Sequence, residues 1–191
     1  MPTPASAVDL EALLAALRQQ PPLSQPFHEV RYRRALKAPL VTAGTLAWQG
    51  GLEFDRRIEQ PYRETGVVSG RTLVVRRERG PERIIPLARA PELQVLFGGL
   101  SALFAGDLQA LRETFEIDLE GAESWRLLLQ PKQAALRERV PVLELRGSDG
   151  RAHCLILRQD GADTLTVFSA QPLEVGGADF DTLVAAQCPN A

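Results

Sequence analysis

Apolar residues recur at three- and four-residue intervals near the start of the chain, which is the spacing of one face of a helix. These positions are Val8, Leu10, Leu13, Leu14 and Leu17. Ser6 or Asp9 can cap the first turn, and Pro21-Pro22 cannot continue a helix. We therefore predict an N-terminal helix with one buried face.

From Phe27 the pattern changes to short apolar or alternating stretches separated by glycine-containing turns, which is typical of antiparallel strands joined by hairpins. The strands predicted before residue 90 span 27–36, 44–48, 52–59, 64–68, 72–77 and 83–85. Those predicted after residue 114 span 115–119, 125–129, 142–146, 152–158 and 164–168. In the last three strands, apolar residues two apart predict one shared apolar face: Leu143/Leu145, Leu155/Leu157 and Leu165/Val167.

The two groups of strands are separated by the segment 91–114, where apolar residues return to helical spacing and predict two short helices. Gly98-Gly99 lies inside the first of them. Each glycine there costs about 1 kcal/mol relative to alanine, which indicates close packing, a kink or mobility. A mobile cover over the sheet is one interpretation. After Pro172 the periodicity is lost, and a final helical turn is expected around Phe180, Leu183 and Val184.

The order of these elements predicts one α+β domain over residues 1–191, because the chain has no internal repeat and no long linker. An antiparallel sheet of about ten to eleven strands curls strongly or closes into a barrel. We therefore expect an incomplete, strongly curled antiparallel β-barrel covered by helices, which encloses an apolar space.

The charge balance argues against nucleic acid as a partner, because 22 basic and 24 acidic residues leave a formal net charge of −2. The charges are unevenly placed. Residues 51–90 hold nine Arg and six acids, a net charge of +3, whereas residues 91–125 hold one Arg and seven acids, a net charge of −6. This polarity can help to orient a partner.

Targeting signals are sparse in the sequence. No apolar run approaches the ~18 residues that a membrane-spanning helix needs. The segment Met1–Ala7 has neither the basic nor the apolar region of a secretion signal, but Met1 can be a start residue placed on a trimmed chain. The N-terminus therefore leaves export undecided.

Catalytic motifs are not found. The sequence has no phosphate-binding loop with lysine, no His-Glu-x-x-His, no Gly-x-Ser-x-Gly and no Cys-x-x-Cys, so we expect no cofactor, no metal and no catalytic residues. His153 and Cys154 are adjacent on a predicted strand and would point to opposite faces, which excludes a thiol–imidazole dyad. Glu53 and Asp55 are followed by Arg56-Arg57, which favours a solvated charged face over a pair of catalytic acids.

The two cysteines, Cys154 and Cys188, leave two alternatives. They can form a disulfide that holds the C-terminal tail on the sheet, stabilising the fold by roughly 3 to 4 kcal/mol, or they can remain unpaired.

Several short motifs resemble the periplasmic outer-membrane lipoprotein carrier family, the LolA-like proteins. They are Gly44-Thr-Leu46-Ala-Trp48, Leu52-Glu-Phe54, Gln60-Pro61 and Ser69-Gly70-Arg71-Thr72-Leu73. Further on, Leu127-Leu-Leu-Gln-Pro131-Lys132 looks like a strand of that family that ends in a Pro-Lys turn. The resemblance covers roughly Leu10 to Ala170.

The resemblance implies a periplasmic carrier without catalytic activity, whose signal peptide is absent from this sequence. It would be a monomer that shields the acyl chains of a lipoprotein or another lipidated envelope molecule on the way to the outer membrane. The implied partners are the acylated cargo, an inner-membrane extraction or export complex and an outer-membrane acceptor.

The sequence departs from the family at one functional position. Carriers of this family have an Arg-Pro pair that helps to hold the closed form, and Gly50 and Gly51 stand there in this chain. Glycine supplies neither a guanidinium nor a fixed backbone. The sequence therefore leaves the mechanism by which the lid opens undetermined. A divergent branch of the family, with another acyl or polyene lipid as cargo, becomes an alternative.

The candidate lipid-binding residues are apolar positions on predicted strand faces and on the helical insertion. They are Leu46, Trp48, Phe54, Ile58, Leu73, Val75, Leu96, Phe97, Leu100, Phe104, Trp125 and Leu127. Two other functions stay open: a non-catalytic envelope interaction domain that keeps the fold without transporting lipid, and an enzyme whose polar groups converge in the cavity.

Overall fold

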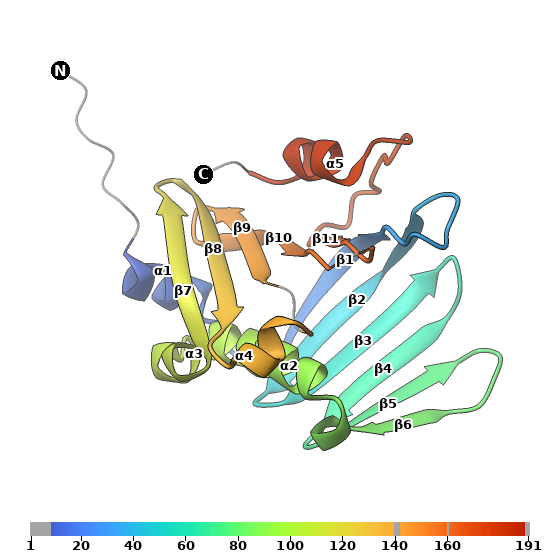
Figure 1. Ribbon diagram of the computed structural model, residues 1–191, viewed down its shortest axis with the longest axis horizontal. Helices are drawn as coiled ribbons and strands as arrows, with labels where there is room; N and C mark the ends of the chain where they lie inside the picture. The colour runs from blue at the N-terminus through green and yellow to red at the C-terminus, as the bar shows by residue number, and fades with distance from the viewer. Residues whose placement is uncertain (1–8, 140–141, 160, 190–191) are drawn as a thin grey trace.

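The computed structural model describes residues 9–139, 142–159 and 161–189, and the described chain forms one 11-stranded antiparallel sheet that is open at both edges (Figure 1). The spatial order is β6-β5-β4-β3-β2-β1-β11-β10-β9-β8-β7. Every neighbouring pair except β1 and β11 is also consecutive in sequence, so two meanders meet at that one long-range pairing. The prediction of an incomplete curled barrel is confirmed.

The elements have the following bounds. The strands are β1 Leu23–Arg31, β2 Leu40–Gly50, β3 Glu53–Gln60, β4 Glu64–Ser69, β5 Thr72–Arg77, β6 Arg83–Pro86, β7 Phe115–Gly121, β8 Ser124–Pro131, β9 Leu143–Ser148, β10 Arg151–Leu157 and β11 Thr164–Val167. The helices are α1 Leu10–Leu17, the 3-10 helix η1 Leu87–Arg89, α2 Pro91–Ala105, α3 Leu108–Thr114, α4 Ala134–Arg137 and α5 Phe180–Gln187.

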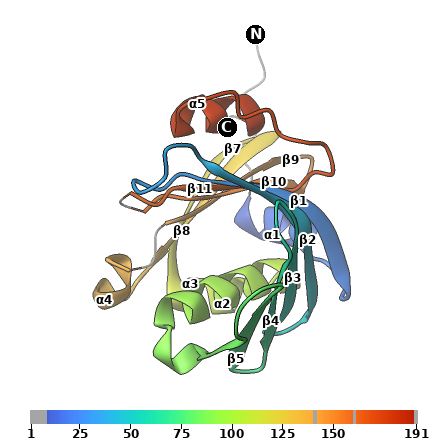
Figure 2. The same cartoon turned by 90° about the vertical axis from the view of Figure 1, so that its right-hand side faces the viewer.

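The helices lie on both sides of the curved sheet. Figure 2 shows α1, α2 and α3 on its concave side, with α5 outside the curve over the strands around β11. The side chains of Asp9, Asp107 and Asp179 accept hydrogen bonds from backbone N–H groups in the first turns of α1, α3 and α5. These bonds pair N–H groups that the helix itself leaves without a partner. Val8 and Ser6, which the sequence analysis assigned to the first helix, lie outside the described residues.

The predicted bounds of the first strand are wrong. The first strand was expected over residues 27–36, but β1 covers Leu23–Arg31 and residues 32–39 connect it to β2. Full-length pairing with β2 explains the shift, since Leu23 lies opposite Trp48 and Arg31 lies opposite Leu40. In the helical insertion, two helices are present as predicted, but α2 runs unbroken for 15 residues through Gly98-Gly99.

Close packing accounts for one glycine of that pair. A Cβ atom at Gly99 would stand 2.9 Å from Cζ of Phe115, so only glycine lets this ring lie against the helix backbone. A Cβ atom at Gly98 would meet nothing within 4 Å.

The sheet carries two separate apolar cores, and the single shared face predicted for the last three strands is wrong. Leu143, Leu145 and Leu155 belong to the concave core, whereas Leu165 and Val167 face α5 on the convex side. The reason is that β10 is apolar on both faces: its Cys154 and Ile156 lie opposite Val167 and Leu165 in β11. A period-2 pattern shows which residues of a strand share a face, but it does not show which of the two faces points inward.

A disulfide between Cys154 in β10 and Cys188 after α5 fastens the convex core. The two Cα atoms are 5.9 Å apart, and the cysteines are separated by 34 residues in sequence. This bridge ties α5 to the sheet, where Phe180, Leu183 and Val184 are buried.

We predict that the double substitution Cys154→Ala/Cys188→Ala lowers the free energy of unfolding by about 3 to 4 kcal/mol, because the unfolded chain regains the entropy that a loop of this length removes. Urea denaturation followed by circular dichroism measures the difference. Reduced wild-type protein should unfold at the midpoint of the variant. An unchanged midpoint in both would show that the bridge does not stabilise the fold.

Candidate functional site

The concave face of the sheet is a continuous apolar surface that α2 covers. Trp48 and Phe54 lie opposite each other on β2 and β3, and both are buried. From α2, the ring of Phe97 lies 5.4 Å from the ring of Phe54, and the ring of Phe104 lies 5.5 Å from that of Trp48, measured between centroids. We call this set of four rings the aromatic contact.

The predicted lipid-binding residues lie together on this face and on its covering helix. Six are buried: Trp48, Phe54, Ile58, Leu100, Trp125 and Leu127. Six are half-buried: Leu46, Leu73, Val75, Leu96, Phe97 and Phe104. All except Ile58 and Val75 belong to one apolar cluster. Sequence spacing thus identified a set that is contiguous in space, and the role of this set in lipid binding stays a prediction.

A cleft of about 470 Å³ lies between the covering helices and the strands β1 and β10. Its walls combine apolar and polar side chains: Leu17, Gln19, Gln25, Pro26, Leu103, Phe104, Leu145, Arg151, Ala152, His153 and Phe168. Among the predicted lipid-binding residues only Phe104 lines it. Leu17 and Leu103 line this cleft but were not among the predicted lipid-binding residues. Helical spacing identified both as apolar positions of predicted helices, but it did not show where the helices lie against the sheet.

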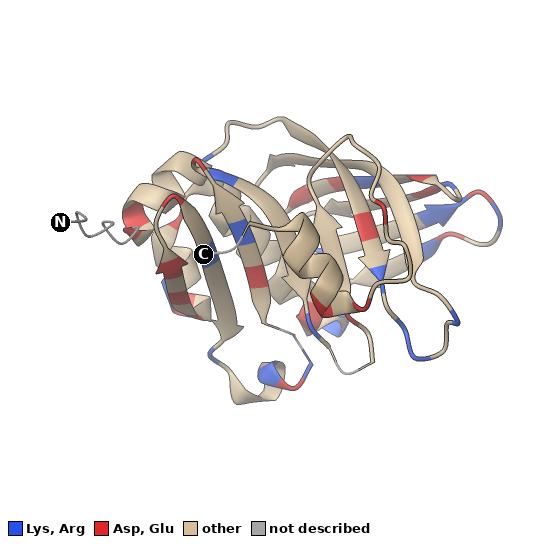
Figure 3. Cartoon of the chain, turned by 90° about the horizontal axis from the view of Figure 1, so that it is seen from above, with Lys and Arg blue, Asp and Glu red and all other residues tan. Residues whose placement is uncertain are grey.

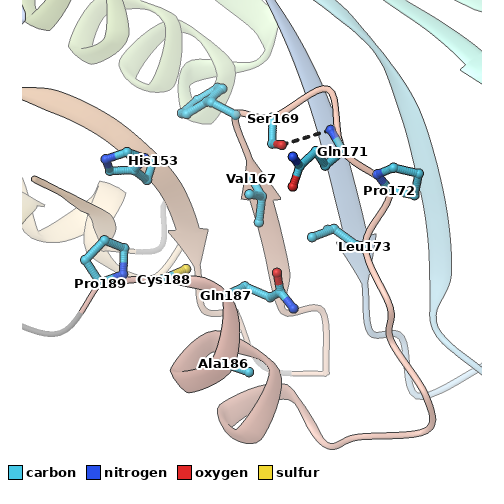
Figure 4. Close-up of a pocket in the computed structure, with 11 residues that line it drawn as sticks. His153, Val167, Ser169, Gln171, Pro172, Leu173, Ala186, Gln187, Cys188 and Pro189 are labelled. Carbon is cyan, nitrogen blue, oxygen red and sulfur yellow. Dashed lines mark hydrogen bonds between the residues drawn. The ribbon is translucent and has the colours of Figure 1, made fainter.

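A second cleft, of about 490 Å³, lies outside the curve beside the disulfide (Figure 4). His153 and Phe168 border both clefts. In the second cleft the Ser169 hydroxyl accepts a hydrogen bond from the backbone N–H of Gln171 at 2.9 Å. Its lining includes Gln171, in the segment that leads from β11 to α5, and Gln187, the last residue of α5.

Gly50 and Gly51, where the resembling family has Arg-Pro, form the turn between β2 and β3. The Gly51 carbonyl accepts a hydrogen bond from the Ser101 hydroxyl of α2 at 2.6 Å and another from Nε1 of Trp48 at 2.9 Å. A backbone carbonyl therefore holds the covering helix here. Gly51 has φ +50°, which proline cannot adopt, so an Arg-Pro pair would distort this turn before it could act on the helix.

A charged cluster interrupts the apolar concave face between β1, β2, β3 and β11. Glu29 in β1 is only 7% exposed, and its Oε1 accepts hydrogen bonds from Arg31 and, at 2.9 Å, from Nη2 of Arg56. Its Oε2 accepts a hydrogen bond from the Thr166 hydroxyl at 3.3 Å. The Arg56 guanidinium also lies over the ring of Phe27, 4.7 Å from the centroid. We call Glu29, Arg31, Thr42, Arg56 and Thr166 the Glu29 cluster.

Arg56 of β3 reaches Glu29 of β1 across β2, and beside this contact Gly44 lets the backbones of β2 and β3 approach closely. Gly44 lies opposite Phe27 on β1, and the register between β2 and β3 shifts beside it. A Cβ atom at Gly44 would stand 1.8 Å from the carbonyl oxygen of Arg57. The expectation that Arg56 belongs to a solvated charged face is wrong, since alternation turns Arg56 inward, whereas Arg57 and Asp55 pair at 2.9 Å on the other face.

Two buried polar atoms lack a hydrogen-bond partner within the described part of the chain, and both belong to the concave face. They are Oγ1 of Thr42 and Nε1 of Trp125. Thr42 lies opposite Glu29, and Trp125 lies opposite Gly147. Buried polar groups are nearly always paired in native proteins, so these two atoms are groups that a bound molecule could satisfy.

The convex face carries charges in a different arrangement. Burial pushes the pKa of Glu144 up, but hydrogen bonds from Arg126 at 3.0 Å and Arg146 at 2.7 Å outweigh burial and leave this pKa below its ordinary value. Figure 3, which views the molecule from above, shows Lys or Arg positions and Asp or Glu positions close together on neighbouring strands. The basic segment 51–90 forms the sheet edge that ends in β6, and the acidic segment 91–125 forms α2, α3 and the opposite edge, β7.

No constellation for catalysis is visible in residues 9–139, 142–159 and 161–189. These residues contain no group of three His, Cys, Asp or Glu side chains that could hold a metal ion. Cys154 is joined to Cys188, so it offers no thiol, and Nε2 of His153 bonds the Ser148 hydroxyl at 3.1 Å. No helix in the same residues has the length and apolar character required to span a bilayer.

We predict that Ser101→Ala raises the association rate of a fluorescent fatty acid about two- to tenfold, because removal of one hydrogen bond favours detachment of α2 from the Gly51 carbonyl. Stopped-flow mixing measures the rate. Ser24→Ala, at an exposed position of β1, is the matched control and should leave the rate unchanged. Equal rates for Ser101→Ala and wild type would show that this hydrogen bond does not hold the covering helix.

Comparison with known proteins gives the family of this chain. A family model described as outer membrane lipoprotein carrier protein LolA-like matches residues 2–185. No protein with a curated description matches the chain. Similar solved structures include a LolA superfamily protein from Nitrosomonas europaea, which is 13% identical over 88% of this chain and 96% of that chain, with a TM-score of 0.44.

Two others are more distant in sequence. An outer membrane lipoprotein-sorting protein domain from Vibrio parahaemolyticus is 8% identical over 93% of this chain and 95% of that chain, with a TM-score of 0.42. A DUF1329 family protein from Desulfovibrio piger is 10% identical over 92% and 96% of the two chains, with a TM-score of 0.40. The family assignment rests on the match of the family model to nearly the whole sequence: this chain belongs to the LolA-like family of outer membrane lipoprotein carrier proteins.

Proposed function

We propose that the protein is a periplasmic carrier that shields the acyl chains of a lipoprotein or another lipidated envelope molecule during transfer toward the outer membrane. The observation that carries this proposal is the apolar concave face, on which α2 is held by the aromatic contact and by one side-chain hydrogen bond to a turn. Family membership supports the same function. No reaction is part of the proposal.

The physical need for such a carrier follows from the cost of exposing an acyl chain to water. Each CH₂ group contributes about 0.8 kcal/mol, so a chain of about sixteen carbons forfeits roughly 12 kcal/mol when it leaves a membrane. A carrier recovers this free energy only if the chain contacts apolar side chains instead of water. The concave face offers such side chains from Trp48 on β2 to Leu127 on β8.

The described conformation is closed, and loading requires α2 to move away from the sheet. An entering acyl chain would replace Phe97 and Phe104 against Trp48 and Phe54, exchanging one apolar contact for another. For these two rings the exchange changes the buried apolar area little, which lowers the cost of opening. The 470 Å³ cleft beside Phe104 is the place from which this exchange would start.

The proposed partners follow from this route. Loading would involve an inner-membrane extraction or export complex, and release would involve an outer-membrane acceptor, with the carrier acting as a monomer between them. Because the Gly50-Gly51 turn replaces the Arg-Pro pair, we place the chain in a divergent branch whose cargo can be a lipoprotein or another acyl or polyene lipid.

We predict that Phe97→Asp weakens binding of a fluorescent fatty acid more than about 100-fold, because a carboxylate would lie in the apolar path of the chain. Fluorescence titration of the folded variant measures the affinity. Gln94→Asp adds the same charge to the exposed side of the same helix and should bind like wild type. Wild-type affinity in a folded Phe97→Asp variant would refute the assignment of the concave face as the lipid site.

The alternative is a non-catalytic envelope interaction domain that keeps the fold without transport. The close packing of the concave core favours this function, since Trp125 and Leu127 are almost fully buried in the closed form. Native mass spectrometry of protein secreted into a periplasm separates the two. A co-purifying acyl species supports the carrier, whereas a ligand-free mass together with no displacement of a fluorescent fatty acid supports the interaction domain.

A further inference from the structure

The Glu29 cluster places charge where the proposed carrier function alone would require none. Arg56 lies on the same face of β3 as Phe54 and Ile58, its neighbours two residues away, and both of these are buried apolar side chains. Replacing a buried ion pair with apolar residues is often neutral or stabilising, so the stability of the fold is not by itself a reason for this cluster.

The cluster carries a surplus of positive charge. One carboxylate, Glu29, is shared by two guanidinium groups, which leaves a net charge of +1. The side chains of Arg31 and Arg56 are 28% and 26% exposed, whereas that of Glu29 is 9% exposed, so the surplus lies on the solvent side of the cluster.

Donors remain available for a second anion. The bonds to Glu29 use Nε of Arg31 and Nη2 of Arg56. Each guanidinium has five N–H donors in a planar fork that fits carboxylate and phosphate oxygens. Glu29 thus orients two guanidinium groups and leaves most of their donors unused by the bonds just named.

Thr42 supplies an independent sign that a ligand belongs here. It is 1% exposed and lies opposite Glu29, yet its hydroxyl has no hydrogen-bond partner within the described residues. A buried hydroxyl left unpaired in this way is destabilising, so its retention requires an explanation. A bound anion at the cluster would accept hydrogen bonds from this hydroxyl and from the guanidinium groups.

We propose that the Glu29 cluster binds the anionic head group, a carboxylate or a phosphate, of an amphiphile whose hydrocarbon chain lies on the apolar concave face; this assignment rests on the proposed carrier function. The cluster fixes the polar end of the cargo at β1–β3, and the apolar surface from Phe54 to Trp48 receives the chain. The cargo class is therefore an acidic lipid or an acidic lipid anchor, not a neutral one.

Displacement of the neutral dye N-phenyl-1-naphthylamine by dodecanoate, dodecyl phosphate and dodecanol tests this proposal, because the three probes share one chain and differ in the head group. Wild-type protein should bind at least one of the two anions about tenfold more tightly than dodecanol. Arg56→Gln should remove this preference and change the affinity for dodecanol less than about twofold. Preference for dodecanoate alone identifies a carboxylate head group, and preference for dodecyl phosphate alone identifies a phosphate.

Two further variants separate ligand binding from folding. Thr42→Val keeps the shape of the side chain and leaves the pairs between Glu29 and both arginines intact, and it should weaken binding of the preferred anion about three- to tenfold without affecting dodecanol. Arg57→Gln removes the same charge one residue away on the opposite face, where Arg57 pairs with Asp55, and should bind all three probes like wild type.

Equal affinities of wild-type protein for the three probes overturn the head-group assignment and leave the carrier function standing. The same conclusion follows if Arg56→Gln and Thr42→Val change the affinities for dodecanol and for the anions equally. Failure of the wild-type protein to bind any of the three probes contradicts the carrier function, and the head-group assignment with it.

Discussion

The contact between α2 and the concave face of the sheet keeps the inner apolar surface of this open sheet away from water. An open sheet of eleven strands leaves a long apolar surface on its inner side, and without a cover that surface would be exposed to water. The aromatic contact covers it with side chains that are large, apolar and half-buried on the helix side. Because this contact is apolar on both sides, a hydrocarbon chain can take the place of either partner. The apolar character that stabilises the closed form thus also permits α2 to move away when a chain enters.

Two glycines mark places where the backbone itself shapes this face. At Gly44 a Cβ atom would stand 1.8 Å from the carbonyl oxygen of Arg57, so only glycine lets β2 and β3 approach this closely. At Gly51 the exposed carbonyl takes the role of a side-chain partner for α2. Gly44 belongs to the motif that resembles the carrier family, whereas Gly51 stands where that family has Arg-Pro, so one glycine follows the resemblance and the other departs from it.

The sequence was sufficient to predict the curled sheet, the helical insertion and most of the apolar surface, because alternation and helical spacing are local signals. It could not predict the inward orientation of Arg56. Arg56 and Arg57 are neighbours on one strand, and the alternation of side chains does not show which of the two points inward. It also missed the second core under α5. There β10 is apolar on both faces, and only the long-range pairing of β1 with β11 decides which face points inward. These failures concern contacts between residues far apart in sequence, which periodicity does not record.

Quenching of tryptophan fluorescence by a brominated fatty acid shows whether acyl chains occupy the concave face, because the chain has two tryptophans and both, Trp48 and Trp125, are buried there. If acyl chains occupy this face, dibromostearate should quench both residues at saturating concentration, and stearate should not. Single-tryptophan variants, Trp48→Phe and Trp125→Phe, assign the quenching to each site. Binding of dibromostearate without quenching of either tryptophan would place the lipid elsewhere and contradict the account.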